Sequence, residues 1–330
     1  MFEIAETKTR QTESRRVGNT ECDFFISGTG NASEDVLDAF LPTLDQNQTI
    51  QKRPRMYVLA REDIPVLPHF EWARSWIQTR QVVPEGCTYP FRVFIDKHTG
   101  TIYVYDTLSK NGVIHTRRRS ETDLRGMITP FRLMWSWLAT SHNSAVIHGS
   151  AVRTSAGTLV FAGPSGSGKS TIAVDIALDN GHLVSDDCLW ITGRSCFPVF
   201  DRAKVSPHSP AAEQLRKRGI SLDSFNTTVE SKHYFRVSQL NGGSVQKSEI
   251  SKVFFPRIWP ELSSLAISRR SAFRRIASDA KREAFGIGVR SLISIAKLCQ
   301  TTPAAMVWLG PEPKSNIEYV LSLLEDKMDV

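Results

Sequence analysis

One short stretch, GPSGSGKST, constrains this chain more than any other part of its sequence. It consists of Gly163, Pro164, Ser165, Gly166, Ser167, Gly168, Lys169, Ser170 and Thr171. From Gly163 to Ser170 it matches the pattern G-x-x-x-x-G-K-[ST] of the phosphate-binding P-loop. An apolar, β-rich run (158–162) precedes the stretch, and a helical run (171–178) follows it. The sequence therefore predicts a strand, a glycine-rich loop and a helix in direct succession.

The predicted loop has the chemistry of a nucleotide site. Its glycines allow successive backbone N–H groups to point at phosphates, and the N-terminus of the next helix adds partial positive charge. We expect residues 163–171 to bind ATP, with Lys169 on the β- and γ-phosphates and Ser170 as a ligand of Mg²⁺. A fortuitous glycine-rich turn is the alternative, and the matching flanks argue against it.

Composition limits the class of protein. With 41% hydrophobic and 23% charged residues, the chain resembles a soluble globular protein, and no apolar run approaches the roughly 20 residues of a membrane span. The N-terminus lacks a signal-peptide pattern. The 5 cysteines show no C-x-x-C pair and no metal-ligand spacing, which suits a reducing cytosol. We therefore expect a cytoplasmic protein, and we interpret its net charge of +7 as a solvated surface rather than a nucleic-acid interface.

The 330 residues are enough for two domains. Residues 1–140 contain a clear hairpin pattern, 91–95 with 101–105, among other short strand and helix candidates. They predict a smaller α+β domain of unknown role. Residues 123–141 read as an apolar helix that packs the two halves together. Residues 141–330 alternate strand and helix patterns, which predicts an α/β domain around the loop.

Two adjacent acids follow the loop. Asp186 and Asp187 come 17 and 18 residues after Lys169, inside a run (182–191) that otherwise reads as an apolar strand. Buried carboxylates are costly unless they have partners or chemical work. We expect this strand to lie beside the strand of the loop, with one carboxylate on Mg²⁺ and the other accepting a proton from an attacking hydroxyl. Capping of the next turn is the alternative.

His148 is a further candidate. It lies in a predicted strand (145–152) that precedes the loop, and from there it could reach the mouth of the loop. A lone histidine in an apolar strand is more often structural, so its position alone does not assign it a task.

These motifs together resemble the catalytic domain of the HPr kinase/phosphorylase family. The resemblance rests on Ile147-His148-Gly149, on the loop, and on Leu183-Val184-Ser185-Asp186-Asp187, and it extends from about residue 140 to residue 330. It implies a P-loop kinase domain of the type shared with phosphoenolpyruvate carboxykinases. It also implies ATP- and Mg²⁺-dependent phosphorylation of a serine in a protein or peptide, and it makes a homo-oligomer possible.

The resemblance assigns roles to individual residues. It implies that Lys169 binds phosphate and that Ser170 and Asp187 serve the metal. Asp186 would be the base, and His148 would assist near the transferring phosphate.

The chain also departs from that family. Thr171 stands where the family has an acidic residue, and the later glycine-rich signature of the reverse reaction is not evident. We therefore expect forward transfer only. Two other functions fit the loop: a small-molecule kinase, and an ATPase or ATP-gated interaction protein. The His-Gly pair favours the protein kinase, and the sequence has no L-S-G-G-Q motif of transporter-type ATPases.

Overall fold

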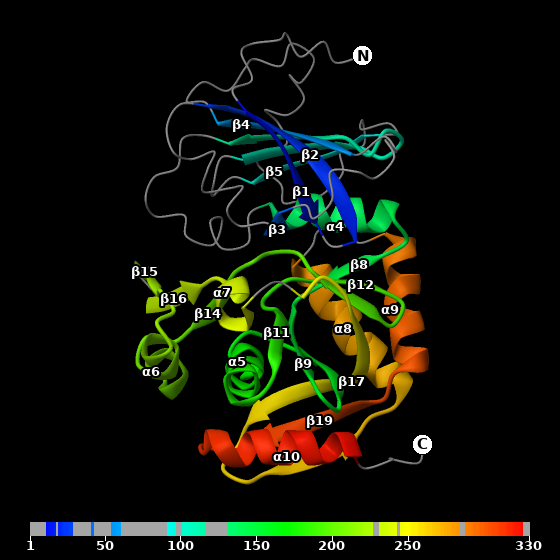
Figure 1. Cartoon of the computed structure of the whole chain (residues 1–330). Helices are drawn as coiled ribbons and strands as arrows, with labels where there is room; N and C mark the ends of the chain where they lie inside the picture. The colour runs from blue at the N-terminus through cyan, green and yellow to red at the C-terminus, as the bar shows by residue number, and fades with distance from the viewer. Residues whose placement is uncertain are drawn as a thin grey trace.

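The chain folds into a mixed α/β structure, which confirms the expected class at that level. The computed structural model describes residues 11–17, 19–28, 41–42, 54–60, 91–96, 101–116, 131–226, 231–242, 245–283 and 288–325. These residues form three sheets. Helix α4 (Arg132–Ser141) lies between the N-terminal sheet and the larger C-terminal part (Figure 1).

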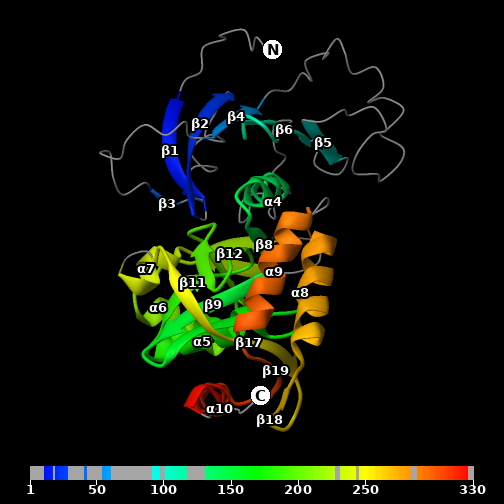
Figure 2. The same cartoon turned by 90° about the vertical axis from the view of Figure 1, so that its right-hand side faces the viewer.

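The N-terminal sheet has seven strands in the order β3-β1-β2-β4-β7-β6-β5. They are β1 (Gln11–Val17), β2 (Thr20–Gly28), β3 (Leu41–Pro42), β4 (Arg55–Ala60), β5 (Phe91–Asp96), β6 (Thr101–Asp106) and β7 (Gly112–Thr116). The predicted hairpin is confirmed, because β5 and β6 pair antiparallel with Phe94 opposite Tyr103. One side of this sheet rests on α4 (Figure 2).

Helix α4 joins the two halves of the chain, as its apolar sequence predicts. Every residue from 133 to 140 is buried, as expected of a helix that is covered on all sides. Its core cluster contains Tyr105 and Ile114 from the N-terminal sheet and Trp190 from the C-terminal part. The first part of the predicted helix, 123–130, lies outside the described residues. The predicted boundary after residue 140 falls at the end of this helix.

The main C-terminal sheet has nine strands: β8 (Ala145–Ile147), β9 (Gly149–Thr154), β10 (Gly157–Ala162), β11 (His182–Ser185), β12 (Leu189–Thr192), β13 (Ser195–Pro198), β17 (Ser248–Ile258), β18 (Ser263–Ala266) and β19 (Ala304–Leu309). Seven of them follow the order β11-β9-β10-β17-β13-β12-β8, while β19 pairs with β17 and β18. Strands β10, β17 and β19 run parallel as neighbours, so their carboxyl ends share one edge of the sheet.

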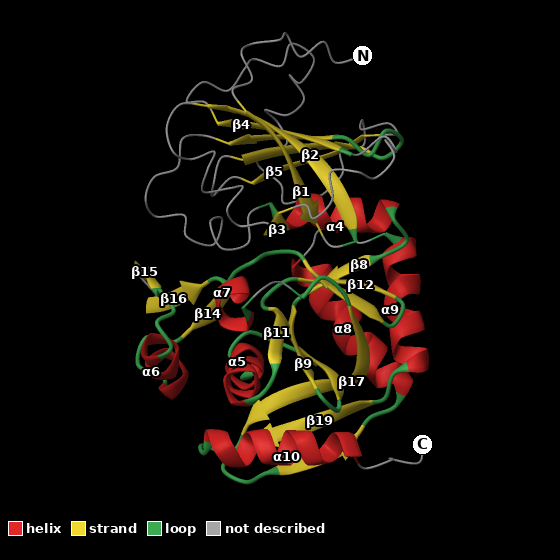
Figure 3. Ribbon diagram, in the orientation of Figure 1, coloured by secondary structure: helices red, strands yellow, loops and turns green. Residues whose placement is uncertain are grey.

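Helices cover both faces of this sheet (Figure 3). They are α5 (Lys169–Asp179), α6 (Pro210–Lys217), α7 (Val237–Asn241), α8 (Arg269–Glu283), α9 (Val289–Thr301) and α10 (Pro313–Glu325). Successive side chains of a strand point to opposite faces. Accordingly, Phe161 of β10 packs in one cluster with α5 and α10, whereas Val160 packs in another with α8 and α9. A third, small sheet lies beside α6, with the strands β14 (Ala203–Val205), β15 (Asp223–Asn226) and β16 (Ser231–Phe235).

One strand predicted before the loop is wrong in its extent. Residues 145–152 do not form one strand, because the chain breaks at His148 into β8 and β9. Strand β8 pairs with β12, whereas β9 pairs with β10 and β11. Because the two segments form hydrogen bonds with different neighbouring strands, one straight strand could not make both sets of pairings.

The strand predicted over 182–191 is also wrong, in two respects. Strands β11 and β12 are separated by a turn at residues 186–188, where the carboxylates leave the sheet to find polar partners. In addition, β11 does not lie beside β10. A tight hairpin returns β9 along β10, so β9 occupies the position between them. Pairing of this kind depends on contacts that the local sequence pattern does not encode.

Within the part of the chain that the structure describes, no helix combines the length and the apolar character needed to cross a membrane.

Asp175 offers a test of the packing of α5. Its side chain is 8% exposed, and burial raises its pKa from 3.8 to about 6. The folded state therefore binds more protons than the unfolded state between these values, and stability falls as the pH rises through them. We expect Asp175→Asn to raise the free energy of unfolding by about 3 kcal/mol at about pH 8, at roughly 1.4 kcal/mol per pKa unit. Urea denaturation should show this gain disappear near pH 4. A gain of equal size at both pH values would contradict the ionisation argument.

Candidate functional site

The glycine loop, residues 163–168, connects β10 directly to α5. The strand, loop and helix predicted from the motif are thus all present. Gly163, Gly166 and Gly168 have φ values of 137°, 80° and 97°, which glycine adopts at little cost and other residues rarely adopt. A Cβ atom at Gly168 would also lie 2.9 Å from Cδ1 of Ile258. The backbone conformation therefore favours glycine at all three positions, and at Gly168 the contact with Ile258 disfavours a side chain as well.

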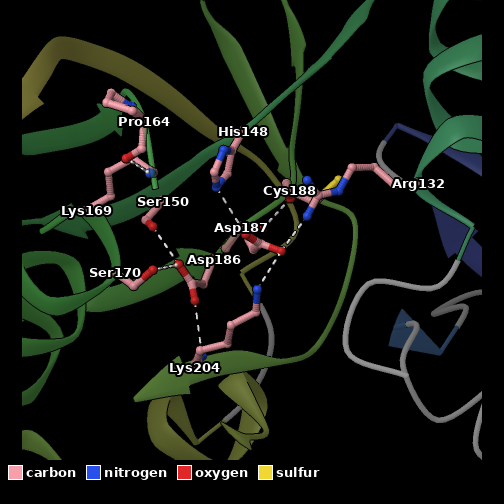
Figure 4. A network of polar contacts seen from close by, with 11 residues as sticks. Arg132, His148, Ser150, Pro164, Lys169, Ser170, Asp186, Asp187, Cys188 and Lys204 are labelled. Carbon is pink, nitrogen blue, oxygen red and sulfur yellow. Dashed lines mark hydrogen bonds and ion pairs between the residues drawn. The ribbon is translucent and has the colours of Figure 1, made fainter. Parts of the chain in front are cut away.

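Two side chains of the loop are placed in a way that suits an anionic ligand. The Nζ atom of Lys169 is folded back over the loop and donates to the carbonyl oxygen of Pro164 at 2.8 Å (Figure 4). The hydroxyl of Ser167 is buried and has no hydrogen-bond partner among the described residues. Buried polar groups are nearly always paired. An unpaired hydroxyl inside such a loop therefore points to a ligand atom as its partner.

Asp186 is fully buried and is connected to the loop by its side chain. Its Oδ1 atom accepts hydrogen bonds from the hydroxyls of Ser150 at 2.5 Å and Ser170 at 2.6 Å. Its Oδ2 atom accepts from the backbone N–H of Lys204 at 3.0 Å. Of the two acids, Asp186 is the one that contacts the serine at the start of α5 (Figure 4).

Asp187 has an entirely different set of partners. Its Oδ1 atom lies 3.1 Å from Nε2 of His148, and its Oδ2 atom lies 2.8 Å from Nζ of Lys204. Oδ2 also forms an ion pair with the guanidinium of Arg132. Burial by itself would raise the pKa of Asp187, but Arg132, together with His148 and Lys204, lowers this pKa well below its usual value. The carboxylate is therefore ionised.

A tight turn separates the two carboxylates. Asp187 has a φ of 66°, and the N–H of Cys188 donates to the carbonyl oxygen of Asp186 at 2.8 Å across it. Left-handed backbone at a residue other than glycine costs about 1–3 kcal/mol and persists where the surroundings enforce it. The turn directs adjacent residues to opposite tasks, with Asp186 toward two serines and Asp187 toward three basic side chains.

The structure brings most of the sequence-predicted residues together. His148, Ser170, Asp186 and Asp187 form one connected network, and Lys169 lies in the adjoining loop. His148 reaches Asp187 because it occupies the break between β8 and β9. At the tip of the loop Pro164, Ser165 and Gly166 are exposed, and so is Thr171 on the outer side of α5.

Three residues of this network were missed by reasoning from sequence. Ser150 directly follows the His-Gly pair, which is a weak signal. Arg132 is a basic residue at the start of an otherwise apolar helix, and a charge at such a place could have been questioned. Lys204 belongs to no motif, and it meets the acids through the small sheet, so no sequence spacing links it to them.

The described residues contain no group of three or more His, Cys, Asp or Glu side chains arranged for a metal ion. Magnesium requires less from the protein, because it commonly binds one or two carboxylates together with water and substrate phosphates. Ser170 and Asp186, whose oxygens are 2.6 Å apart, are suited to such a site.

Neither the scan against protein-family models nor the search of curated proteins found a match for this chain. We therefore base the functional assignment on the sequence motif and on the geometry of the site.

The ion pairs of Asp187 lead to a test of stability. Asp187→Asn keeps a side chain that tolerates left-handed backbone and removes the charge. We expect a loss of about 3 kcal/mol in the free energy of unfolding near pH 7, the usual effect of removing one member of a buried ion pair. Because the folded-state pKa is depressed, this stabilisation is fully present above the unfolded-state value of 3.8 and is lost as the pH falls below it. Denaturation with urea at a series of pH values would measure it, and equal stability of the two proteins near pH 7 would contradict it.

Proposed function

We propose that this protein is an ATP- and Mg²⁺-dependent kinase that phosphorylates a serine hydroxyl in a protein or peptide, with a P-loop domain similar to that of HPr kinases. The hydrogen bond from Ser170 to Asp186 is the observation that carries the proposal. It joins the serine of a phosphate-binding motif to a buried carboxylate, which is the pairing that holds Mg²⁺ in P-loop enzymes.

The loop fits the phosphates of ATP. Its three left-handed glycines leave the backbone free of side chains, and no atom lies within 4 Å of a Cβ position at Gly166. The unpaired hydroxyl of Ser167 is available to a phosphate oxygen. The ammonium of Lys169 exchanges its bond to a loop carbonyl for a contact with phosphate, and the N-terminus of α5 adds partial positive charge.

The proposal assigns Mg²⁺ to Ser170 and Asp186, whereas the resemblance alone paired Ser170 with Asp187. Both oxygens of Asp187 face basic side chains, and these repel a second cation. Asp186 faces hydroxyls and a backbone N–H instead. When bound, the metal neutralises negative charge on the transferring phosphoryl group.

On the same contacts we propose that His148 and Asp187 act at the acceptor hydroxyl. Phosphoryl transfer passes through a loose transition state, so the main task of the protein is to orient the hydroxyl and accept its proton late. Asp187 is held ionised and fixes the imidazole of His148 at 3.1 Å. This pair replaces Asp186 as the proposed acceptor of the proton. Arg132 and Lys204 lie beside it and offset negative charge.

The serine in a protein substrate, the cytoplasmic location and a homo-oligomer are inferred from the sequence resemblance and composition. The small-molecule kinase and the ATPase share the same loop, and the fate of the phosphoryl group separates these three functions.

The proposed transfer can be followed with ATP labelled in its γ-phosphate. We expect label on a serine of a candidate protein or peptide, and we expect Lys169→Ala to reduce the transfer rate by about a hundredfold or more, as for other groups that stabilise developing charge. Lys217→Ala, in an exposed ion pair on α6, is the matched control. Label found on small molecules alone, or as free phosphate alone, would overturn the protein-kinase proposal.

The division of tasks between the acids has a separate test. Asp186→Asn should raise the Mg²⁺ concentration for half-maximal transfer by more than about tenfold, as expected for loss of a metal contact. Asp187→Asn should raise this concentration by less than Asp186→Asn does, because it only loosens the turn that positions Asp186, and it should lower kcat by about a hundredfold, the scale of a lost proton acceptor. Steady-state rates over a Mg²⁺ titration measure both effects. The reverse pattern would return the metal to Asp187.

A further inference from the structure

Arg132 reaches the candidate site from the other half of the chain. It is the first residue of α4, and its guanidinium pairs with Asp187 across 55 positions of sequence. Figure 4 shows its side chain extending from α4 toward the turn at the two acids. Helix α4 packs in the core cluster that includes the N-terminal sheet. This ion pair is therefore a direct link between that core and the site.

The backbone on the Arg132 side of the pair is constrained. Phe131, the residue before Arg132, has a φ of 58°, which is unfavourable for an aromatic residue. Its ring is buried and meets Tyr103 of β6 edge-on, with ring centroids 6.3 Å apart. The N-terminal sheet thus fixes the point from which the Arg132 side chain departs.

The backbone on the Asp187 side is constrained as well. Asp187 has a φ of 66°, and Asp186, the preceding residue, belongs to the same turn. Lys204 contacts both acids, through its backbone N–H and its Nζ atom, and His148 contacts Asp187. Conformations of this kind persist where the surroundings over-determine them. The ion pair links Asp187 to Arg132, the residue that follows Phe131, and is one of the interactions that hold the turn.

We propose that Arg132 is a positioning residue through which the N-terminal sheet sets the geometry of the site. It holds Asp187 in its left-handed turn and thereby keeps the Asp186 carboxylate on Ser170. The inference rests on the proposed kinase function. It gives residues before α4 a task in the reaction, although none of their side chains needs to touch ATP or the acceptor.

The effect of Arg132 on the reaction follows from this indirect role. Arg132 acts on the acids and not on the glycine loop, so nucleotide affinity measured without Mg²⁺ should stay unchanged when it is replaced. The Mg²⁺ requirement and kcat should both change, because a shifted turn misplaces both Asp186 and Asp187.

The test compares three full-length variants with the wild type. Arg132→Met removes the charge and keeps much of the side-chain length, Arg132→Lys restores the charge, and Arg270→Met replaces an exposed arginine of α8 as the control. We expect Arg132→Met to raise the half-saturating Mg²⁺ concentration and to lower kcat, each by about tenfold, the scale of a lost supporting contact at a metal site. Arg132→Lys should recover part of both values, and Arg270→Met should match the wild type.

Hydrogen exchange supplies a readout that does not need activity. The N–H of Cys188 is bonded across the turn, so Arg132→Met should accelerate exchange in a peptide covering residues 183–190 while the core strands β10 and β17 stay protected. Tyr103→Leu, which lies in the N-terminal sheet and contacts Phe131, should accelerate exchange in the same peptide to a smaller extent.

The outcomes separate the two proposals. If the wild type neither binds ATP nor transfers phosphate, the kinase proposal fails, and the exchange data still decide whether Arg132 holds the turn. If the wild type transfers phosphate and Arg132→Met matches it in kcat, Mg²⁺ requirement and exchange, the positioning role is overturned. Faster exchange throughout the molecule in Arg132→Met, with no recovery in Arg132→Lys, would assign Arg132 to folding and would also overturn it.

Discussion

The ionised carboxylate of Asp187 is the constraint on which the candidate site depends. A buried charge needs compensation, and here Arg132, His148 and Lys204 provide it from α4, from the break between β8 and β9, and from β14. Their combined effect keeps the carboxylate charged despite its burial. Since each partner comes from a different element, the position of one side chain fixes how three parts of the chain meet.

This arrangement explains why two adjacent acids behave as different groups. The turn at Asp187 sends neighbouring carboxylates in opposite directions, so that Asp186 accepts hydrogen bonds from hydroxyls and Asp187 faces two cations and an imidazole. A metal ion prefers the first environment, because there the carboxylate's charge is not already neutralised. The second environment suits a fixed carboxylate that orients a histidine. Accordingly, we propose that Asp186 binds the metal ion and that Asp187 acts with the histidine at the acceptor hydroxyl.

Much of the C-terminal architecture could be predicted from the sequence, because it is local. The strand, glycine loop and helix at residues 157–179 follow from a contiguous motif. The sequence predicted β11 as the neighbour of β10, but β9 lies there instead, because strand pairing depends on interactions between segments that no local pattern specifies. Arg132 and Lys204 escaped prediction for the same reason. They meet Asp187 from 55 positions before it and from a separate small sheet, and a sequence motif records only residues at fixed spacing.

The position of β9 between β10 and β11 limits how this site could be transplanted. Consider a design that grafts only the glycine loop and the acidic turn onto another scaffold. Without β9, the strands that replace β10 and β11 would be direct neighbours and would lie closer together by one strand spacing, about 4.8 Å. The graft would also lack Ser150, which β9 places on Asp186. The smallest portable unit is therefore the hairpin of β9 and β10 with α5, β11 and the turn, and it still needs external groups to take the places of Arg132, His148 and Lys204.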